Sequence, residues 1–135
     1  MRVCLRLALL LVLLNPTGAF AQEFDGTSPV LCASIDTLSC GPGEDCLRST
    51  ADELNVPQFI RINFADKLVS ATRTDGEDRT SEIQNLFVND AEILLQGNQA
   101  GLGWSAAISR ASGKLALSAV GDSVAFVIFG ACTPM

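Results

Sequence analysis

The chain has 135 residues, with 15 acidic and nine basic side chains, a net charge of −6, and no histidine or tyrosine. The lack of histidine excludes Ser-His-Asp and Cys-His catalysis and any zinc or haem site that uses histidine ligands. The acidic balance argues against nucleic acid and against an anionic membrane surface, because both are bound through clustered Lys and Arg. We therefore expect no cofactor and a neutral or basic partner.

The first 21 residues have the pattern of a secretory signal peptide. Arg2 and Arg6 precede the apolar run Leu7–Leu14, and residues 19–21 supply a small-residue cleavage pattern. No apolar run in the chain is long enough to cross a bilayer. Cleavage after Ala21 would remove 21 of the 135 residues and two of the nine bases, leaving 114 residues and a net charge of −8. The sequence predicts one small exported domain, periplasmic or extracellular, with no membrane insertion after cleavage.

Four cysteines follow this leader. An even number of cysteines in a small exported domain predicts two disulfides, and the spacing contains no C-x2-C pair of a zinc site. The turn-rich segment 41–45 can bring Cys40 and Cys46 together, which leaves Cys32 to pair with Cys132. The alternative pairing joins Cys32 to Cys46 and Cys40 to Cys132.

Polar residues 22–29 are expected to form a flexible N-terminal arm before a single β-domain over 30–134. From there, short apolar alternation is broken by turn residues every eight to twelve positions. Thr50 and Glu53 fit a capping box, which predicts one short helical turn near 50–54. The alternation predicts eight strands, at 31–35, 60–64, 68–69, 83–88, 92–97, 104–109, 115–119 and 124–132.

These short strands and tight connections favour an all-β antiparallel meander. Closure into a barrel removes both exposed edges of a meander, and a disulfide between Cys32 and Cys132 would join the first strand to the last. We therefore expect a roughly eight-stranded β-barrel, with a two-sheet β-sandwich as the alternative. The side chains expected to point inward include Phe64, Phe87, Trp104 and Phe126.

Four residues are candidates for contact with a ligand or partner. Trp104, the only tryptophan, could stack on a sugar or an apolar ligand, although its place on an alternating strand favours the core. Arg110, Ser112 and Lys114 form a hairpin turn that could present a basic tip, the alternative being ordinary solvated charges.

The acidic loop at Asp75, Glu77 and Asp78 is a weaker candidate. Its spacing is not that of an EF-hand, so we expect no metal site and a solvated loop in which Arg79 pairs with a neighbouring carboxylate. Catalysis by carboxylates alone needs two acids across a cleft, whereas the acids here fall mostly in turns. We therefore expect that the protein is not an enzyme.

Two patterns resemble known groups of proteins. The pattern W-x3-I-x-R-x2-G-x-L over 104–115, the segment Phe129–Pro134, the four cysteines and the segment Val56–Arg61 resemble a group of small exported proteobacterial four-cysteine β-domain proteins with no assigned activity. The expected architecture is also similar to that of periplasmic inhibitors of c-type lysozyme, small disulfide-tied β-barrels that present a Ser-Gly loop. Ser112-Gly113 echoes that loop, but the tyrosine that usually follows it is absent.

Together these features predict a non-catalytic, monomeric binding or interaction module of the bacterial envelope, whose partner is an unknown protein or small molecule. One alternative is a carrier that holds an apolar ligand inside the barrel. Another is an inhibitor of a cell-wall hydrolase, because the basic surface of such an enzyme would attract an acidic protein.

Overall fold

The computed structural model describes residues 24–135; the expected signal peptide at 1–21 lies outside them. No helix in the described part of the chain is long and apolar enough to span a membrane. Within residues 24–135 the chain forms ten strands: β1 (Val30–Cys40), β2 (Leu47–Ser49), β3 (Phe59–Asn63), β4 (Leu68–Thr72), β5 (Asp78–Glu82), β6 (Asn85–Val88), β7 (Glu92–Gln99), β8 (Leu102–Ser109), β9 (Lys114–Val120) and β10 (Ala125–Pro134).

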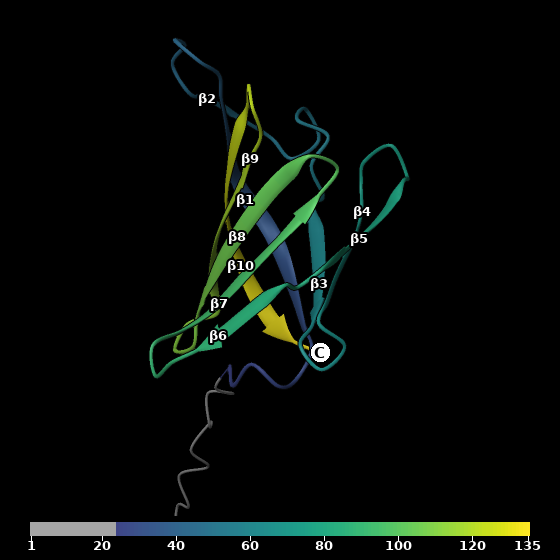
Figure 1. The fold of residues 1–135 in the computed structure, drawn as a ribbon, viewed down its shortest axis with the longest axis vertical. Helices are drawn as coiled ribbons and strands as arrows, with labels where there is room; N and C mark the ends of the chain where they lie inside the picture. The colour runs from purple at the N-terminus through teal and green to yellow at the C-terminus, as the bar shows by residue number, and fades with distance from the viewer. Residues whose placement is uncertain (1–23) are drawn as a thin grey trace, which may run out of the picture.

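All ten strands belong to one antiparallel sheet, ordered β5-β4-β3-β1-β10-β9-β8-β7-β6, with β2 paired to β1. The sheet curls into a half-barrel (Figure 1). We call the end with the β1–β2, β4–β5, β7–β8 and β9–β10 connections the mouth, and the opposite end, where the chain finishes, the base. The expected barrel-like antiparallel meander is confirmed.

The two end strands of the sheet, β5 and β6, are consecutive in the chain with only Ile83 and Gln84 between them. The Ile83 N–H donates a hydrogen bond to the Lys67 carbonyl on one side, and the Gln84 N–H donates to the Gln96 carbonyl on the other, each at 2.8 Å. This short segment therefore links the two ends of the curled sheet.

A β-bulge in β1 separates two kinds of pairing. One edge of β1 pairs with β10 throughout, while the other edge pairs with β3 near the base and with β2 near the mouth. The register shifts between Ser34, opposite Gly130, and Asp36, opposite Phe129, so that Ile35 has no partner in β10. A bulge of this kind bends the strand and increases its twist, which helps the sheet to curl.

The bulge changes which side chains of β1 face the interior. Cys32 is buried before the bulge and Thr37 after it, where the Thr37 hydroxyl donates to a carbonyl of β2. Ile35 itself is 72% exposed. Leu31, Ala33 and Ile35 correctly predicted a strand, but their side chains lie on its outer face.

Two disulfides connect Cys32 to Cys132 and Cys40 to Cys46. The first joins directly opposed positions of β1 and β10, with the two Cα atoms 3.9 Å apart, and Cys32 is fully buried. The second closes the β1–β2 hairpin at the mouth, with a Cα–Cα distance of 4.2 Å. The expected pairing is confirmed, and the two bridges indicate an oxidising environment.

Large aliphatic side chains fill the base of the half-barrel. They come from both ends of the sheet order and form one cluster, to which Phe64 adds its ring. Removal of this apolar surface from water is the main favourable term that holds the curled sheet together. The members of the cluster include Val30, Cys32, Ile60, Ile62, Ile83, Ile93, Leu95, Ile108, Leu115 and Cys132.

Residues 24–29 pack against the base. The Phe24 ring is buried against Gly113, whose φ of +68° and missing side chain allow this approach, because a Cβ there would lie 2.4 Å from the ring. The Phe24 N–H donates to the Arg110 carbonyl at 3.3 Å. Next along the chain, the Thr27 hydroxyl and the Thr27 and Ser28 N–H groups donate to Asp25, which lowers the pKa of that carboxyl.

The capping box at Thr50 and Glu53 forms its hydrogen bonds, but no helix follows. The Thr50 N–H donates to the Glu53 carboxylate at 2.9 Å, and the Glu53 N–H donates to the Thr50 hydroxyl at 3.3 Å. The Thr50 N–H, and after it the Thr50 hydroxyl, lower the pKa of Glu53. Asn55 then adopts a φ of +50°, and Pro57 follows, so residues 51–55 form turns. The Leu54 N–H donates to the Thr50 carbonyl at 3.3 Å, so the expected turn near 50–54 forms but does not continue into a helix.

Three further details differ from the sequence-based expectations. β2 and β5 were not expected, because Leu47–Ser49 and Asp78–Glu82 contain mostly polar residues and show no apolar alternation. Phe87 was expected to point inward but is 60% exposed, and its neighbour Leu86 is half-buried. Leu86 and Phe87 are both large and apolar, so the alternation alone could not decide which of them faces the core.

The two disulfides should differ in their contributions to stability. The Cys32–Cys132 bridge closes a loop 100 residues long and the Cys40–Cys46 bridge one of six. In the chain-entropy model these loops correspond to about 4.7 and about 2 kcal/mol. We expect the Cys32→Ala/Cys132→Ala variant to lose about 2–3 kcal/mol more free energy of unfolding than the Cys40→Ala/Cys46→Ala variant in chemical denaturation. Equal losses would contradict this account.

Candidate functional site

A cavity of about 290 Å³ opens at the mouth of the half-barrel. Its walls come from β3, β4 and β5 on one side and from β8, β9 and β10 on the other, and the segment 54–57 and the β7–β8 turn border it. The apolar side chains that line it include Val56, Val69, Trp104, Leu117, Phe126 and Ile128.

Several inward positions toward the mouth carry small side chains, beside the large rings of Trp104 and Phe126. Near the mouth, the row across β7, β8 and β9 consists of Gly97, Trp104 and Ala119. Ala71 on β4 and Ser81 on β5 also line the cavity. Small residues on several walls leave space that the large aliphatic residues of the base do not. Near the base, the corresponding row across the same three strands is Ile93, Ile108 and Leu115.

Trp104 is held in a defined position at the edge of the cavity. Its indole Nε1–H donates to the Ser81 hydroxyl at 2.8 Å, and that hydroxyl donates to the Asn98 carbonyl at 3.0 Å. The ring lies over Gly97, its cross-strand partner, where an added Cβ would be 2.4 Å from the indole and 2.5 Å from the Glu82 carbonyl. The half-buried indole therefore serves as a fixed apolar wall.

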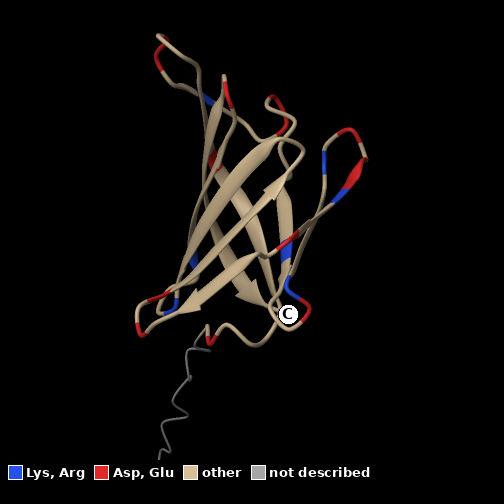
Figure 2. Cartoon of the chain, viewed as in Figure 1, with Lys and Arg blue, Asp and Glu red and all other residues tan. Residues whose placement is uncertain are grey.

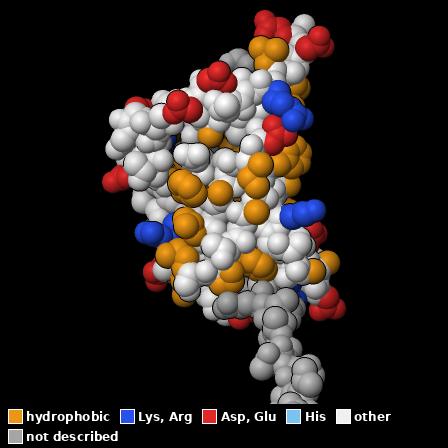
Figure 3. Space-filling view, turned by 180° about the vertical axis from the view of Figure 1, so that it is seen from behind, with side chains coloured by type: hydrophobic (Ala, Val, Ile, Leu, Met, Phe, Trp, Pro, Cys, Tyr) orange, Lys and Arg blue, Asp and Glu red, His pale blue; other side chains and the backbone are white. Residues whose placement is uncertain are grey.

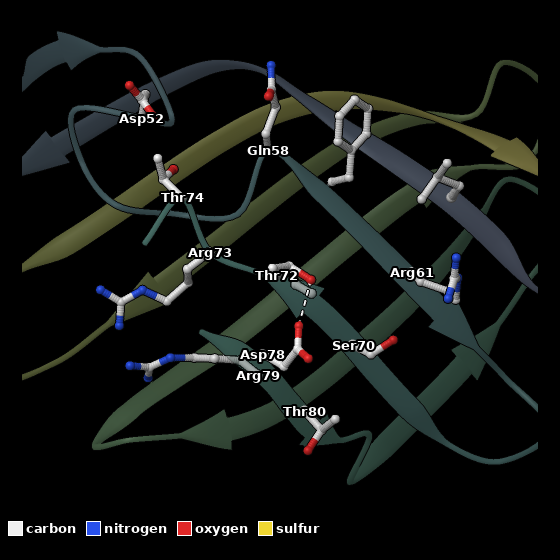
Figure 4. Close-up of a pocket in the computed structure, with 13 residues that line it drawn as sticks. Asp52, Gln58, Arg61, Ser70, Thr72, Arg73, Thr74, Asp78, Arg79 and Thr80 are labelled. Atoms are coloured by element: carbon white, nitrogen blue, oxygen red, sulfur yellow. Dashed lines mark hydrogen bonds between the residues drawn. The ribbon is translucent and has the colours of Figure 1, made fainter. Parts of the chain in front are cut away.

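Two arginines of the β4–β5 hairpin lie at the rim of the cavity. Figure 4 shows the side chains of Arg73 and Arg79 extending in the same direction, away from Thr72 and Asp78. Their side chains are only 20% and 28% exposed. The rim therefore places two guanidinium groups beside an apolar space.

Each of these arginines is paired with acids of its own hairpin. Arg73 contacts Asp75 at 3.0 Å and Glu77 at 3.2 Å, and Arg79 contacts the same Glu77 oxygen at 2.9 Å. The expected pairing of Arg79 with a neighbouring acid is confirmed. The Asn55 amide donates to the Asp75 carboxylate at 2.9 Å, which ties the segment 54–57 to the hairpin across the mouth.

A second hollow, of about 590 Å³, lies on the outer face of β3, β4 and β5 (Figure 4). Its floor is polar: the Thr72 hydroxyl donates to the Asp78 carboxylate at 2.7 Å, and Thr80 is exposed nearby. Arg61 borders it at the other side. A surface of exposed hydroxyl and carboxylate groups is well solvated, so this hollow offers less binding energy than the apolar cavity.

The outer face of the sheet also exposes large apolar side chains. Ile35, Phe59 and Phe129, from β1, β3 and β10, are all exposed. Figure 3 shows hydrophobic side chains gathered over the middle of the face opposite to that seen in Figure 1. Beside Phe129, Ala107 and Ala116 form a shallow hollow with Ile35. In the described part of the chain nothing covers this surface.

Charge is concentrated at the two ends of the half-barrel. Figure 2 shows Asp and Glu on the connections at both the mouth and the base, with few charged side chains along the strands between. The acids at the mouth include Asp52, Asp75 and Asp122. Both ends are therefore more acidic than the wall.

The structure does not bring the sequence-based candidate residues together. Trp104 lines the cavity at the mouth, whereas Arg110, Ser112 and Lys114 lie at the base. Arg110 is half-buried and donates from Nε to the Phe24 carbonyl and from Nη1 to a carbonyl of the β6–β7 turn, each at 2.8 Å. Ser112 and Lys114 are exposed. The hydrolase-inhibitor hypothesis, which uses this tip, stays a prediction.

The sequence did not identify Arg73 and Arg79 as site residues. Charged residues beside a hairpin loop are ordinarily solvated. The alternation of inward and outward residues along β4 could have identified Arg73, because Val69 and Ala71 face inward and Arg73 follows at the same spacing of two residues.

No protein-family model, curated protein or solved structure matches this chain.

The fit of Trp104 over Gly97 can be tested with two glycine variants. Gly97→Ala should displace the indole, because the new Cβ would overlap it and the Glu82 carbonyl. We expect a loss of about 1–3 kcal/mol in the free energy of unfolding, as for other overpacked cores, together with a shift of tryptophan emission. Gly103→Ala is the matched control, since a Cβ there meets no atom within 4 Å. Similar behaviour of the two variants would refute the fit.

Proposed function

We propose that this protein is an exported, non-catalytic binding module that carries a small apolar molecule in the mouth of its half-barrel. The observation that carries this proposal is the apolar cavity of about 290 Å³. Its volume is near the lower end of the roughly 300–1,000 Å³ common for ligand pockets. A fixed tryptophan wall and a few polar groups at the rim are also usual for such sites.

The arrangement of charges favours binding over catalysis. Asp75 and Glu77, the acids at the rim, pair with Arg73 and Arg79 and have no second carboxylate facing them across the described walls of the cavity. The interior surface is mainly aliphatic and aromatic. A site of this kind gains its energy from apolar burial, and it offers no positioned acid–base pair.

Export is supported by two observations. The two disulfides fit an oxidising compartment, and the leader expected over 1–21 would direct the chain there. In the bacterial envelope, a small acidic monomer of this type would bind a molecule that is poorly soluble in water.

The carrier function predicts that partly filling the cavity weakens binding. Ala119 lines the cavity, whereas Ala116 is exposed on the outer face of the same strand. We expect Ala119→Leu to weaken the binding of small aliphatic and aromatic compounds by about tenfold or more, and Ala116→Leu to leave it unchanged. Trp104 emission reports binding, and native mass spectrometry of the protein from its own exported fraction identifies any retained ligand. A flat response across the panel, with no retained mass, would remove the carrier function.

Docking of a protein partner is the second candidate function, favoured by the uncovered apolar face around Phe129 and Ile35. Exposed apolar patches often mark interaction sites.

This candidate predicts a position-specific contact. A photoreactive side chain at position 129 should give one discrete protein adduct in the native exported fraction, and Ile35→Ser in the same chain should abolish it. The same group at position 80, exposed on the polar outer face of β5, is the control. Mass spectrometry of the adducts checks the result, and identical adducts from both positions would exclude a specific docking face.

A further inference from the structure

The two aromatic residues that line the cavity stand on either side of one small residue. Across β8, β9 and β10, Trp104 lies directly opposite Ala119, and Ala119 lies directly opposite Phe126. All three residues line the cavity at the mouth. Neighbouring strands are about 4.8 Å apart, so the two rings start from backbone positions about 10 Å apart, with the Ala119 methyl group between them.

The indole of Trp104 leans away from Ala119. Its ring lies over Gly97 on β7, and the hydrogen bond from Nε1 to the Ser81 hydroxyl holds it there. Gly97 and Ala119 are the two cross-strand partners of Trp104, one on each side. The space over Ala119 is therefore not filled by the indole and forms part of the cavity.

Aliphatic side chains close this space at the bottom and on the far side. Leu117 and Ile128, a directly opposed pair nearer the base, line the cavity below Ala119. Val69 and Ala71 of β4 line the other wall. The aliphatic cluster of the base lies deeper still, so the space is a short pocket and does not continue as a tunnel for a long chain.

This arrangement favours a ligand with an aromatic ring. A ring over Ala119 lies one strand spacing, about 4.8 Å, from the strand positions that carry Trp104 and Phe126. Aromatic pairs attract one another at centroid separations of about 4.5–7 Å, beyond the gain from apolar burial. A saturated ring or an open chain with the same number of carbons gains burial alone.

We infer that the ligand is a compact aromatic compound whose ring is held over Ala119, between Trp104 and Phe126. This inference rests on the proposed carrier function and names its ligand class. The competing ligand is an aliphatic compound of similar size that is held by apolar burial.

Three alcohols with seven carbons separate these two classes: benzyl alcohol, cyclohexylmethanol and 1-heptanol. They share the hydroxyl head, and their bodies are an aromatic ring, a saturated ring and an open chain. Isothermal titration calorimetry measures the three dissociation constants, and each is corrected for the partition of the probe from water into octanol. We expect the corrected affinity of benzyl alcohol to exceed the other two by about threefold or more.

Two Phe→Leu variants of β10 test the position of the bound ring. Phe126→Leu replaces the ring in the cavity by an aliphatic side chain, so the advantage of benzyl alcohol should fall by about twofold or more. Phe129→Leu, on the exposed outer face of the same strand, is the matched control and should leave the advantage unchanged.

Methyl NMR spectra of the unaltered protein locate the ring directly. The ring current of bound benzyl alcohol should shift the methyl resonance of Ala119 and leave that of Ala116, exposed on the outer face of β9, unchanged. Cyclohexylmethanol has no ring current, so it should shift Ala119 much less.

The outcomes separate this inference from the proposed function. Equal corrected affinities for the three probes, or tighter binding of a saturated one, would overturn the inference and leave the carrier function in place. An advantage of benzyl alcohol that survives Phe126→Leu, or that comes without a shift at Ala119, would place the ring elsewhere and also overturn the inference. A lack of binding by all three probes would overturn both.

Discussion

The curled sheet depends on the double pairing of β1. One edge of this strand is committed to β10 over its whole length, while the other is shared between β3 and β2, with the bulge at Ile35 between them. At Ser34, just before the bulge, this edge contacts the segment that precedes β3: the Pro57 and Gln58 carbonyls accept hydrogen bonds at 2.8 Å from the hydroxyl and N–H of Ser34. The base is therefore closed by strands, and the mouth is closed in part by a turn.

The wall where β5 and β6 meet β7 also becomes more open toward the mouth. Before Ile83 the chain pairs as β5 with β4, and after Gln84 it pairs as β6 with β7. Toward the mouth, β5 therefore contacts β7 through side chains such as Ser81, whose hydroxyl donates to the Asn98 carbonyl. The base, by contrast, has continuous backbone pairing and the buried Cys32–Cys132 bridge. Opening the mouth would therefore break few hydrogen bonds and expose little of the core.

The sequence predicted those features that leave a regular pattern. Apolar alternation located most of the strands, cysteine spacing gave both disulfides, and Thr50 and Glu53 form the expected capping bonds. The bulge could not be recognised in the sequence, because one extra residue reverses which side chains of the strand face inward without changing the residue types. For that reason the alternation did not show that the inward positions change from Cys32 before the bulge to Thr37 after it.

Of the residues at the candidate site, the sequence predicted inward apolar side chains such as Trp104 and Phe126 but not the two arginines. Arg73 and Arg79 escaped notice because a charge that faces a barrel interior ordinarily needs a partner within the barrel. Here the hairpin provides its own partners, since Asp75 and Glu77 lie between the two arginines in the chain and contact them directly. Local neutralisation lets both arginines lie at the edge of the cavity with their side chains largely buried. A short run of alternating charges that looks like a solvated loop can therefore border an otherwise apolar cavity.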